Sequence, residues 1–99
     1  MIFDSNGKPI LKSGNTYYTD NGTYMKSGNT LYGPDGVEGM QSGNMVFTGS
    51  GTIQVSGNHL YTPKGTYMLC GTMLYGPDGK TWMGVKSMEE AKDIVAMEM

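Results

Sequence analysis

The fold of this chain is decided by a short stretch that contains two kinds of turn, Ser27-Gly-Asn-Thr-Leu-Tyr-Gly-Pro-Asp-Gly36. Its Gly28-Asn29 pair suits a two-residue type II′ turn, in which glycine supplies the positive φ of the first corner. Its Gly-Pro-Asp-Gly end suits a type I turn, where proline presets φ and the last glycine takes the left-handed position. The residues between the two turns are therefore expected to form a short β-strand.

The same two turns recur along most of the chain. Ser-Gly-Asn begins at Ser13, Ser27, Ser42 and Ser56, and it decays to Cys-Gly-Thr at Cys70. The second turn ends in a glycine every 14 or 15 residues, at Gly7, Gly22, Gly36, Gly51, Gly65 and Gly79. Two hairpin turns in each period predict a mainly β fold, an antiparallel meander of short repeated hairpins from Ile2 to Val85. A flattened β-solenoid of the same period is the alternative, because wound coils also place Gly and Asn at their corners.

The last dozen residues follow a different pattern. Ser87-Met-Glu-Glu90 is a capping box, and apolar residues follow at helical spacing at Ala91, Ile94 and Val95. This pattern predicts one C-terminal amphipathic α-helix to about Met97, whose apolar side covers part of the sheet or one end of it. The chain is accordingly expected to be a single domain, with hairpin repeats over residues 1–86 and the helix within residues 87–99.

Strand register decides which side chains share a face of the sheet. A turn at Gly28-Asn29 places Met25 opposite Tyr32, and the equivalent turns repeat this kind of pair along the chain. One face thus carries a column of aromatics opposite thioethers or similar residues, and sulfur–aromatic contacts are worth roughly 0.3–1.5 kcal/mol each. The pairs are Leu11–Tyr18, Met25–Tyr32, Met40–Phe47, Gln54–Tyr61 and Met68–Tyr75. The other face is a more ordinary core mixture of Tyr17, Tyr24, Leu31, Val46, Ile53, Val55, Leu60, Tyr67, Leu69 and Leu74.

Both faces of this sheet are partly apolar, and one short helix cannot cover both. Two interpretations remain open. The sheet coils on itself or dimerises and so buries the aromatic column, or the column stays exposed and binds a partner. Tyr, Phe and Met are the residue types that protein interfaces enrich. The candidate binding residues are Tyr18, Met25, Tyr32, Met40, Phe47, Tyr61, Met68 and Tyr75.

Composition excludes several classes of function. The 99 residues contain no Arg and carry a formal charge of −2, so a nucleic-acid partner is not expected. One cysteine cannot build a disulfide framework or a zinc site, and Cys70 is expected to be a buried thiol. The sequence has no stretch approaching the ~20 apolar residues of a membrane span and no signal peptide. A cytoplasmic protein with no membrane partner is therefore expected.

Catalytic chemistry is not evident in the pattern. His59 occupies a repeat position that Thr16 and Thr30 fill elsewhere, and Asp35 and Asp78 stand at turn corners that backbone hydrogen bonding explains. Glu38 is the one carboxylate expected inside a strand, and paired-carboxylate hydrolysis needs a second acid at a fixed separation. The sequence therefore predicts a protein that is not an enzyme and that has no metal and no cofactor.

One repeat resembles a known family of cell-wall repeats. The string Thr16-Tyr-Tyr-Thr-Asp-Asn-Gly-Thr-Tyr-Met25 is similar to choline-binding-type repeats, which hold choline between tryptophans. Because this chain has only Trp82 and a shorter period, the choline site does not carry over. Residues 13–79 more broadly resemble tandem Gly-Asn…Tyr…Asp-Gly hairpin repeats of bacterial and phage proteins, a likeness that implies no particular activity.

These observations lead by elimination to a small non-enzymatic protein-interaction module. The partner is expected to be another protein, a second copy in a homodimer, or both. By analogy, the chain is expected to be an inhibitor or adaptor encoded by a phage or mobile element, acting on a host protein such as a defence system. The alternatives are a glycan- or cell-wall-binding repeat and a structural repeat that assembles through its sheet edges.

Overall fold

The computed structural model describes residues 2–98, and in that span the chain forms twelve strands followed by one helix, α1 (Met88–Glu98). The strands are β1 (Ile2–Phe3), β2 (Pro9–Ser13), β3 (Thr16–Thr19), β4 (Gly22–Ser27), β5 (Thr30–Gly33), β6 (Gly36–Ser42), β7 (Met45–Thr48), β8 (Gly51–Ser56), β9 (His59–Thr62), β10 (Gly65–Cys70), β11 (Met73–Tyr75) and β12 (Thr81–Met83).

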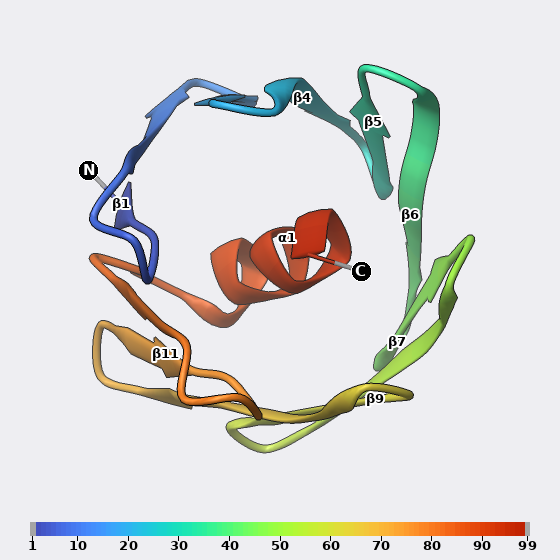
Figure 1. The fold of residues 1–99 in the computed structure, drawn as a ribbon. Helices are drawn as coiled ribbons and strands as arrows, with labels where there is room; N and C mark the ends of the chain where they lie inside the picture. The colour runs from blue at the N-terminus through green and yellow to red at the C-terminus, as the bar shows by residue number, and fades with distance from the viewer. Residues whose placement is uncertain (1, 99) are drawn as a thin grey trace.

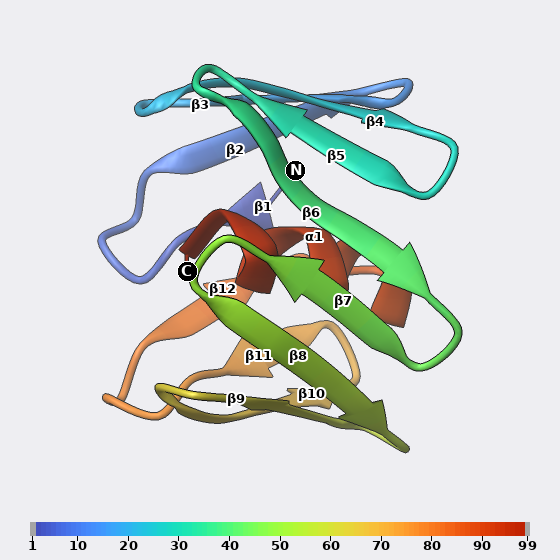
Figure 2. The ribbon, with the colours of Figure 1, turned by 90° about the vertical axis from the view of Figure 1, so that its right-hand side faces the viewer.

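The strands close into an antiparallel barrel. Each strand pairs with its neighbours in the chain, and the barrel closes where β1 pairs with β12. Figure 1 looks down this ring with α1 inside it, and Figure 2 shows the strands running obliquely around the helix. The predicted antiparallel meander with one C-terminal helix is confirmed, and the solenoid alternative is wrong. Every turn joins neighbouring strands, so the twisted sheet curls in one direction until its first and last strands meet.

The turns at one rim of the barrel have the predicted geometry. The glycines of the Gly-Asn and Gly-Thr turns have φ between 59° and 62°, and no non-glycine residue among those described has a positive φ. Positive φ at the first corner alone defines a type II′ turn, whereas a type I′ turn would also need it at the second corner. The expectation from Gly28-Asn29 is therefore confirmed.

Side chains reinforce the turns at the opposite rim. The Thr19 hydroxyl donates to the carbonyl of Gly22 at 2.9 Å and accepts from the N–H of Asn21 at 3.1 Å, and this arrangement recurs at Thr48 and Thr62. Gly22 has φ +130°, and a Cβ there would lie 2.7 Å from Cγ of Pro34 in the next turn along this rim. Adjacent hairpins thus pack proline against glycine, which explains why both residue types recur in the repeat.

The predicted strand register is confirmed. Met25 lies opposite Tyr32 and Lys26 opposite Leu31, as the Gly28-Asn29 turn requires. The equivalent turns place Leu11, Met40, Gln54 and Met68 opposite their expected aromatic partners. The two faces of the sheet therefore carry the side chains that the repeat assigns to them.

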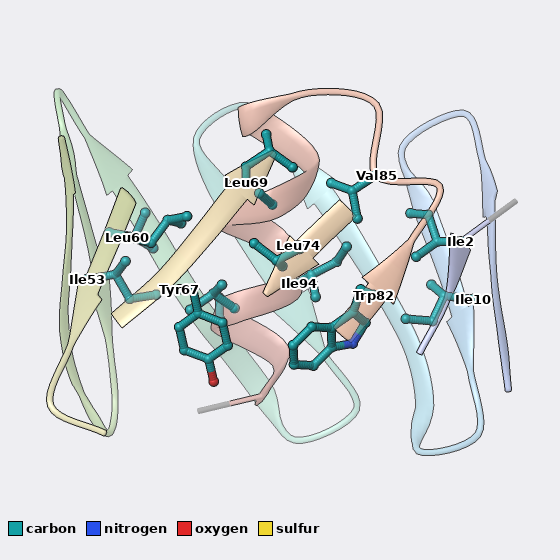
Figure 3. Close-up of a cluster of buried hydrophobic side chains, with 14 of the residues drawn as sticks. Ile2, Ile10, Ile53, Leu60, Tyr67, Leu69, Leu74, Trp82, Val85 and Ile94 are labelled. Atoms are coloured by element: carbon teal, nitrogen blue, oxygen red, sulfur yellow. The ribbon is translucent and has the colours of Figure 1, made fainter. Parts of the chain in front are cut away.

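The core lies inside the barrel, between the strands and the helix (Figure 3). Ile53, Leu60 and Leu74 are fully buried from the sheet, and Ile94 and Val95 are fully buried from the helix. The predicted core face is thus confirmed as the inner face, with Val55 partly buried against the cluster. The prediction that the helix covers part of the sheet is confirmed, because α1 packs against the inner face, where it fills the lumen of the barrel.

The helix passes closest to the wall at β6. A Cβ on Gly39 would lie 3.3 Å from Cβ of Ala96 and 3.2 Å from Cγ1 of Val46. Every other repeat has a larger residue at this inward position, such as Tyr24 or Ile53. The loss of the side chain at Gly39 therefore makes room for the helix backbone.

Candidate functional site

The outer wall of the barrel carries a continuous series of exposed apolar side chains. It consists of six cross-strand pairs, which we call the outer belt: Phe3–Met83, Leu11–Tyr18, Met25–Tyr32, Met40–Phe47, Gln54–Tyr61 and Met68–Tyr75. Its eleven apolar members are between 40% and 53% exposed. A large aromatic side chain has roughly 150–250 Å² of surface, so the belt exposes about 1,000 Å² of apolar side chain. This exceeds the roughly 300–600 Å² of the largest patch on a typical monomer.

The belt lies on a wall without charges. The described strands contain three charged residues, Lys12, Lys26 and Glu38. The two lysines turn inward to acids of the helix. The side chain of Glu38 packs over Gly33 on the inner side, where a Cβ on Gly33 would lie 2.5 Å from Cγ of Glu38. Solvated sheet faces normally carry polar and charged residues, whereas the centres of protein interfaces are depleted of charge. The outer wall therefore has the composition of a contact surface.

All eight candidate binding residues lie in the outer belt. Because the sheet closes, they are distributed around the barrel and do not form one flat column. The interpretation in which a coiled sheet buries this column is wrong for the single chain, since closure buries the other face. The candidate set omitted Phe3 and Met83, which complete the belt across the junction of β1 and β12. The repeat carries no signal for this pair, because it joins the two ends of the meander.

A buried polar cluster fixes the helix inside the barrel near the Gly-Asn rim. The carboxylate of Asp93 accepts a hydrogen bond from the Tyr17 hydroxyl at 2.6 Å and pairs with the Lys26 ammonium at 2.8 Å. The side chains of Lys26 and Asp93 are 16% and 8% exposed. Each polar atom has a partner from the opposite element, so this cluster fixes both the depth and the rotation of α1.

A second ion pair and the helix cap extend this cluster. The Lys12 ammonium lies 3.1 Å from Glu90 Oε2, while Glu90 Oε1 accepts the N–H of Lys86 at 2.9 Å. The N–H of Glu90 is 3.4 Å from the Ser87 hydroxyl, as in the predicted capping box. The reciprocal bond of that box goes to Lys86 and not to Ser87. Glu90 therefore both caps the helix and ties it to β2.

The acidity of these groups follows from their surroundings. Burial raises the pKa of the Tyr17 phenol far above its ordinary value of 10.0, and the hydrogen bond to Asp93 and the charge of Asp93 raise it further. Burial also raises the pKa of Glu90, but the N–H of Lys86 and the Lys12 ammonium outweigh it and leave this pKa below 4.5. At neutral pH the cluster therefore holds a neutral phenol and an ionised Glu90.

The raised pKa of Tyr17 predicts a loss of stability in alkali. Above about pH 10 an unfolded Tyr17 releases its proton while the folded phenol keeps it, so the free energy of unfolding falls as the pH rises. Urea unfolding followed by Trp82 fluorescence between about pH 8 and 11.5 measures this slope. Tyr17→Phe should reduce the slope by up to about one proton, whereas Tyr18→Phe on the outer face should not change it. Equal slopes in the two variants would contradict the assignment.

The barrel interior offers little space for a ligand. A cavity of about 40 Å³ lies near the C-terminal end of α1, beside Tyr24, Ile94 and Met97, which is room for about one water. Two larger hollows, of about 340 and 360 Å³, flank the junction of β1 and β12. The first of these hollows is lined by the Lys12–Glu90 ion pair, and the second by Phe3 and Met83 together with the turn residues Asp4 and Ser5.

His59 and Cys70 are the remaining reactive side chains that the sequence analysis singled out. His59 stacks on Tyr61 with ring centroids 6.0 Å apart. Cys70 is exposed, so the expectation of a buried thiol is wrong, because its strand position points outward like that of Met68. Among residues 2–98, no three His, Cys, Asp or Glu side chains gather in a way that could hold a metal ion.

Comparison with protein-family models, with curated protein sequences and with solved structures found no match to this chain. Within the described residues, no helix has both the length and the apolar character needed to cross a membrane.

Proposed function

We propose that this chain is a small protein-docking module whose outer belt is the contact surface. The observation that carries the proposal is the closed series of exposed Tyr, Phe, Met and Leu side chains on the outer face of the barrel, where the described strands place no charged side chain. Buried aromatic anchors provide most of the binding energy at protein interfaces. The lumen is not part of this surface, since the helix fills it.

The shape of the surface favours a protein over a small ligand. Sites for small molecules are concave, because a pocket must cover most of the ligand. The ring of strands is convex on its outside (Figure 1), and the exposed belt side chains belong to that side. A protein with a complementary concave or flat surface can instead cover several belt residues at once.

A capture experiment with a multiple variant tests the proposal. Tyr32, Phe47 and Tyr61 stand on β5, β7 and β9 along one continuous arc of the belt. Replacing all three with Ser should abolish capture of the partner from an extract of the source cells, while circular dichroism stays native. A partner identified in this way is then purified, and its affinity should fall by about thirtyfold for each of the three anchors that it covers, since each aromatic anchor contributes about 2 kcal/mol.

The matched control changes the same wall outside the belt. Thr23→Ser and Thr66→Ser alter exposed outer-face residues that lie opposite Tyr18 and Tyr61. This double variant should bind the partner as the unchanged chain does. Capture that survives the triple Ser substitution, or that is lost equally in the control, would contradict the proposed surface.

A further inference from the structure

The outer belt repeats one chemical unit around the whole barrel. Four of its six pairs join a methionine to an aromatic ring: Phe3–Met83, Met25–Tyr32, Met40–Phe47 and Met68–Tyr75. Thioether sulfur and aromatic rings attract each other, so such a pair is complementary to a second pair of the same kind. Each of these four sectors of one copy can therefore meet the same kind of sector of another copy with sulfur against ring.

We infer that the outer belt binds neighbouring copies of this chain, so that barrels associate side by side, belt against belt. This inference rests on the proposed function, because it names a partner for the same surface. It commits to a second copy as the occupant and makes a different protein an outcome of the test.

Charge supports a second copy as the occupant. A polyanion or an acidic peptide would find no counter-charge on the outer wall, because the lysines of the described strands are paired inside the barrel. The outer wall of a second copy is also uncharged. Association of two copies therefore does not remove water from a charged side chain on the outer face of the described strands. The formal charge of −2 gives only weak repulsion between whole molecules.

Closure of the barrel decides which part of the molecule makes the contact. The edge-to-edge assembly expected from an open meander needs a free edge strand. In the described chain β1 and β12 pair with each other, which removes that route. The outer faces of the strands remain available for contact, and the belt contains most of their exposed apolar side chains.

The area of the belt predicts how strong this association is. A stable dimer buries about 800 Å² on each partner. The belt exposes about 1,000 Å² around the entire ring, and one neighbour covers only one side of a convex wall. A single contact is therefore too small for a permanent dimer. Because uncovered sectors remain on the other sides, further copies can add, and the assembly does not close at two.

Light scattering after size exclusion tests this inference over about a hundredfold range of concentration. The weight-average mass of the full chain should begin near 10.7 kDa and rise by about twofold or more at the high end without a plateau at the dimer. Sulfate should increase the association and sodium chloride should not dissolve it, as expected for an apolar contact. A mass that stays at the monomer throughout would overturn the inference.

Two triple variants locate the contact. Met25→Lys, Met40→Lys and Met68→Lys place three charges in the belt and should keep the chain monomeric at every concentration. Ser27→Lys, Ser42→Lys and Ser56→Lys add the same charge to exposed outer-face residues nearer the rim and should associate as the unchanged chain does. If the belt variant does not fold, the uncharged Met→Gln replacements at the same three positions provide the test. Association that persists in a folded belt variant would overturn the inference.

The outcomes separate this inference from the proposed function. A chain that stays monomeric but captures a different protein through Tyr32, Phe47 and Tyr61 overturns the inference and leaves the docking proposal standing. Association that depends on the belt, without any captured protein, supports a second copy as the partner.

Discussion

Replacing Ile94 with aspartate should unfold the chain. Ile94 is 1% exposed and lies in the centre of the lumen, where it belongs to the cluster that joins the helix to the wall (Figure 3). The substitution removes an apolar contact and buries a carboxylate among apolar side chains. An uncompensated buried charge costs several kcal/mol, and a domain of this size has about 5–15 kcal/mol of stability in total.

Circular dichroism and the fluorescence of Trp82 measure this outcome. Trp82 is 1% exposed in the same cluster, so loss of the core shifts its emission toward that of a solvated indole. Glu98→Asp is the matched control, because it also places aspartate on α1 but at an exposed position. The control should melt within a few degrees of the unchanged chain. A cooperative melt of similar midpoint in the Ile94 variant would show that the helix is not the core of the barrel.

The second large effect is expected from Asp93. Asp93→Ala removes the acceptor of the Tyr17 hydroxyl and the nearer of two carboxylates beside the Lys26 ammonium, since Glu89 lies 3.9 Å from it. Breaking a buried ion pair by removing one partner costs about 3–5 kcal/mol, because the other charge stays buried. This loss is a large part of the total stability, so the variant should unfold at a much lower urea concentration.

A double variant distinguishes the cost of an unpaired charge from the worth of the pair. Lys26→Met with Asp93→Leu removes both charges and keeps apolar volume, and it should be more stable than Asp93→Ala alone. Adding Tyr17→Phe to the double variant removes the remaining unpaired donor and should restore more of the stability. Urea unfolding of each variant gives the free energies of this cycle. If the double variant is no more stable than Asp93→Ala, the lost stability reflects the attraction between Lys26 and Asp93 and not the cost of an unpaired buried charge.

Much of this fold follows from the turns alone. The Gly28-Asn29 turn fixes the register of Met25 and Tyr32, and its repetition assigns every strand to its neighbours. Alternation along each strand then separates two sets of side chains, since a shift of one residue would exchange the faces. The membership of the outer belt and of the core could therefore be predicted, apart from the pair that joins the two ends.

The closure of the barrel and the position of the helix inside it could not be predicted from the turns. Both faces are partly apolar, so hydrophobicity does not tell which one turns inward, and no local turn records that β1 meets β12. A signal for the helix nevertheless exists in the inward positions near the Gly-Asn rim. These are polar at Lys12, Lys26 and Gln41 and apolar at Val55 and Leu69. The three polar residues bind the acidic residues of α1. Lys12 binds Glu90, Lys26 binds Asp93 and Gln41 binds Glu89.

The enclosed helix also sets the order in which the chain can be built. α1 follows all twelve described strands in the chain and so leaves the ribosome after them, yet it must be in place when β1 and β12 close the barrel around it. The hairpins can form one by one during synthesis, because their contacts are local. The final closure must wait until α1 has been synthesised. Until then the nascent sheet exposes both apolar faces and both edges, so this stage of biogenesis is the one most open to chaperone capture and to aggregation.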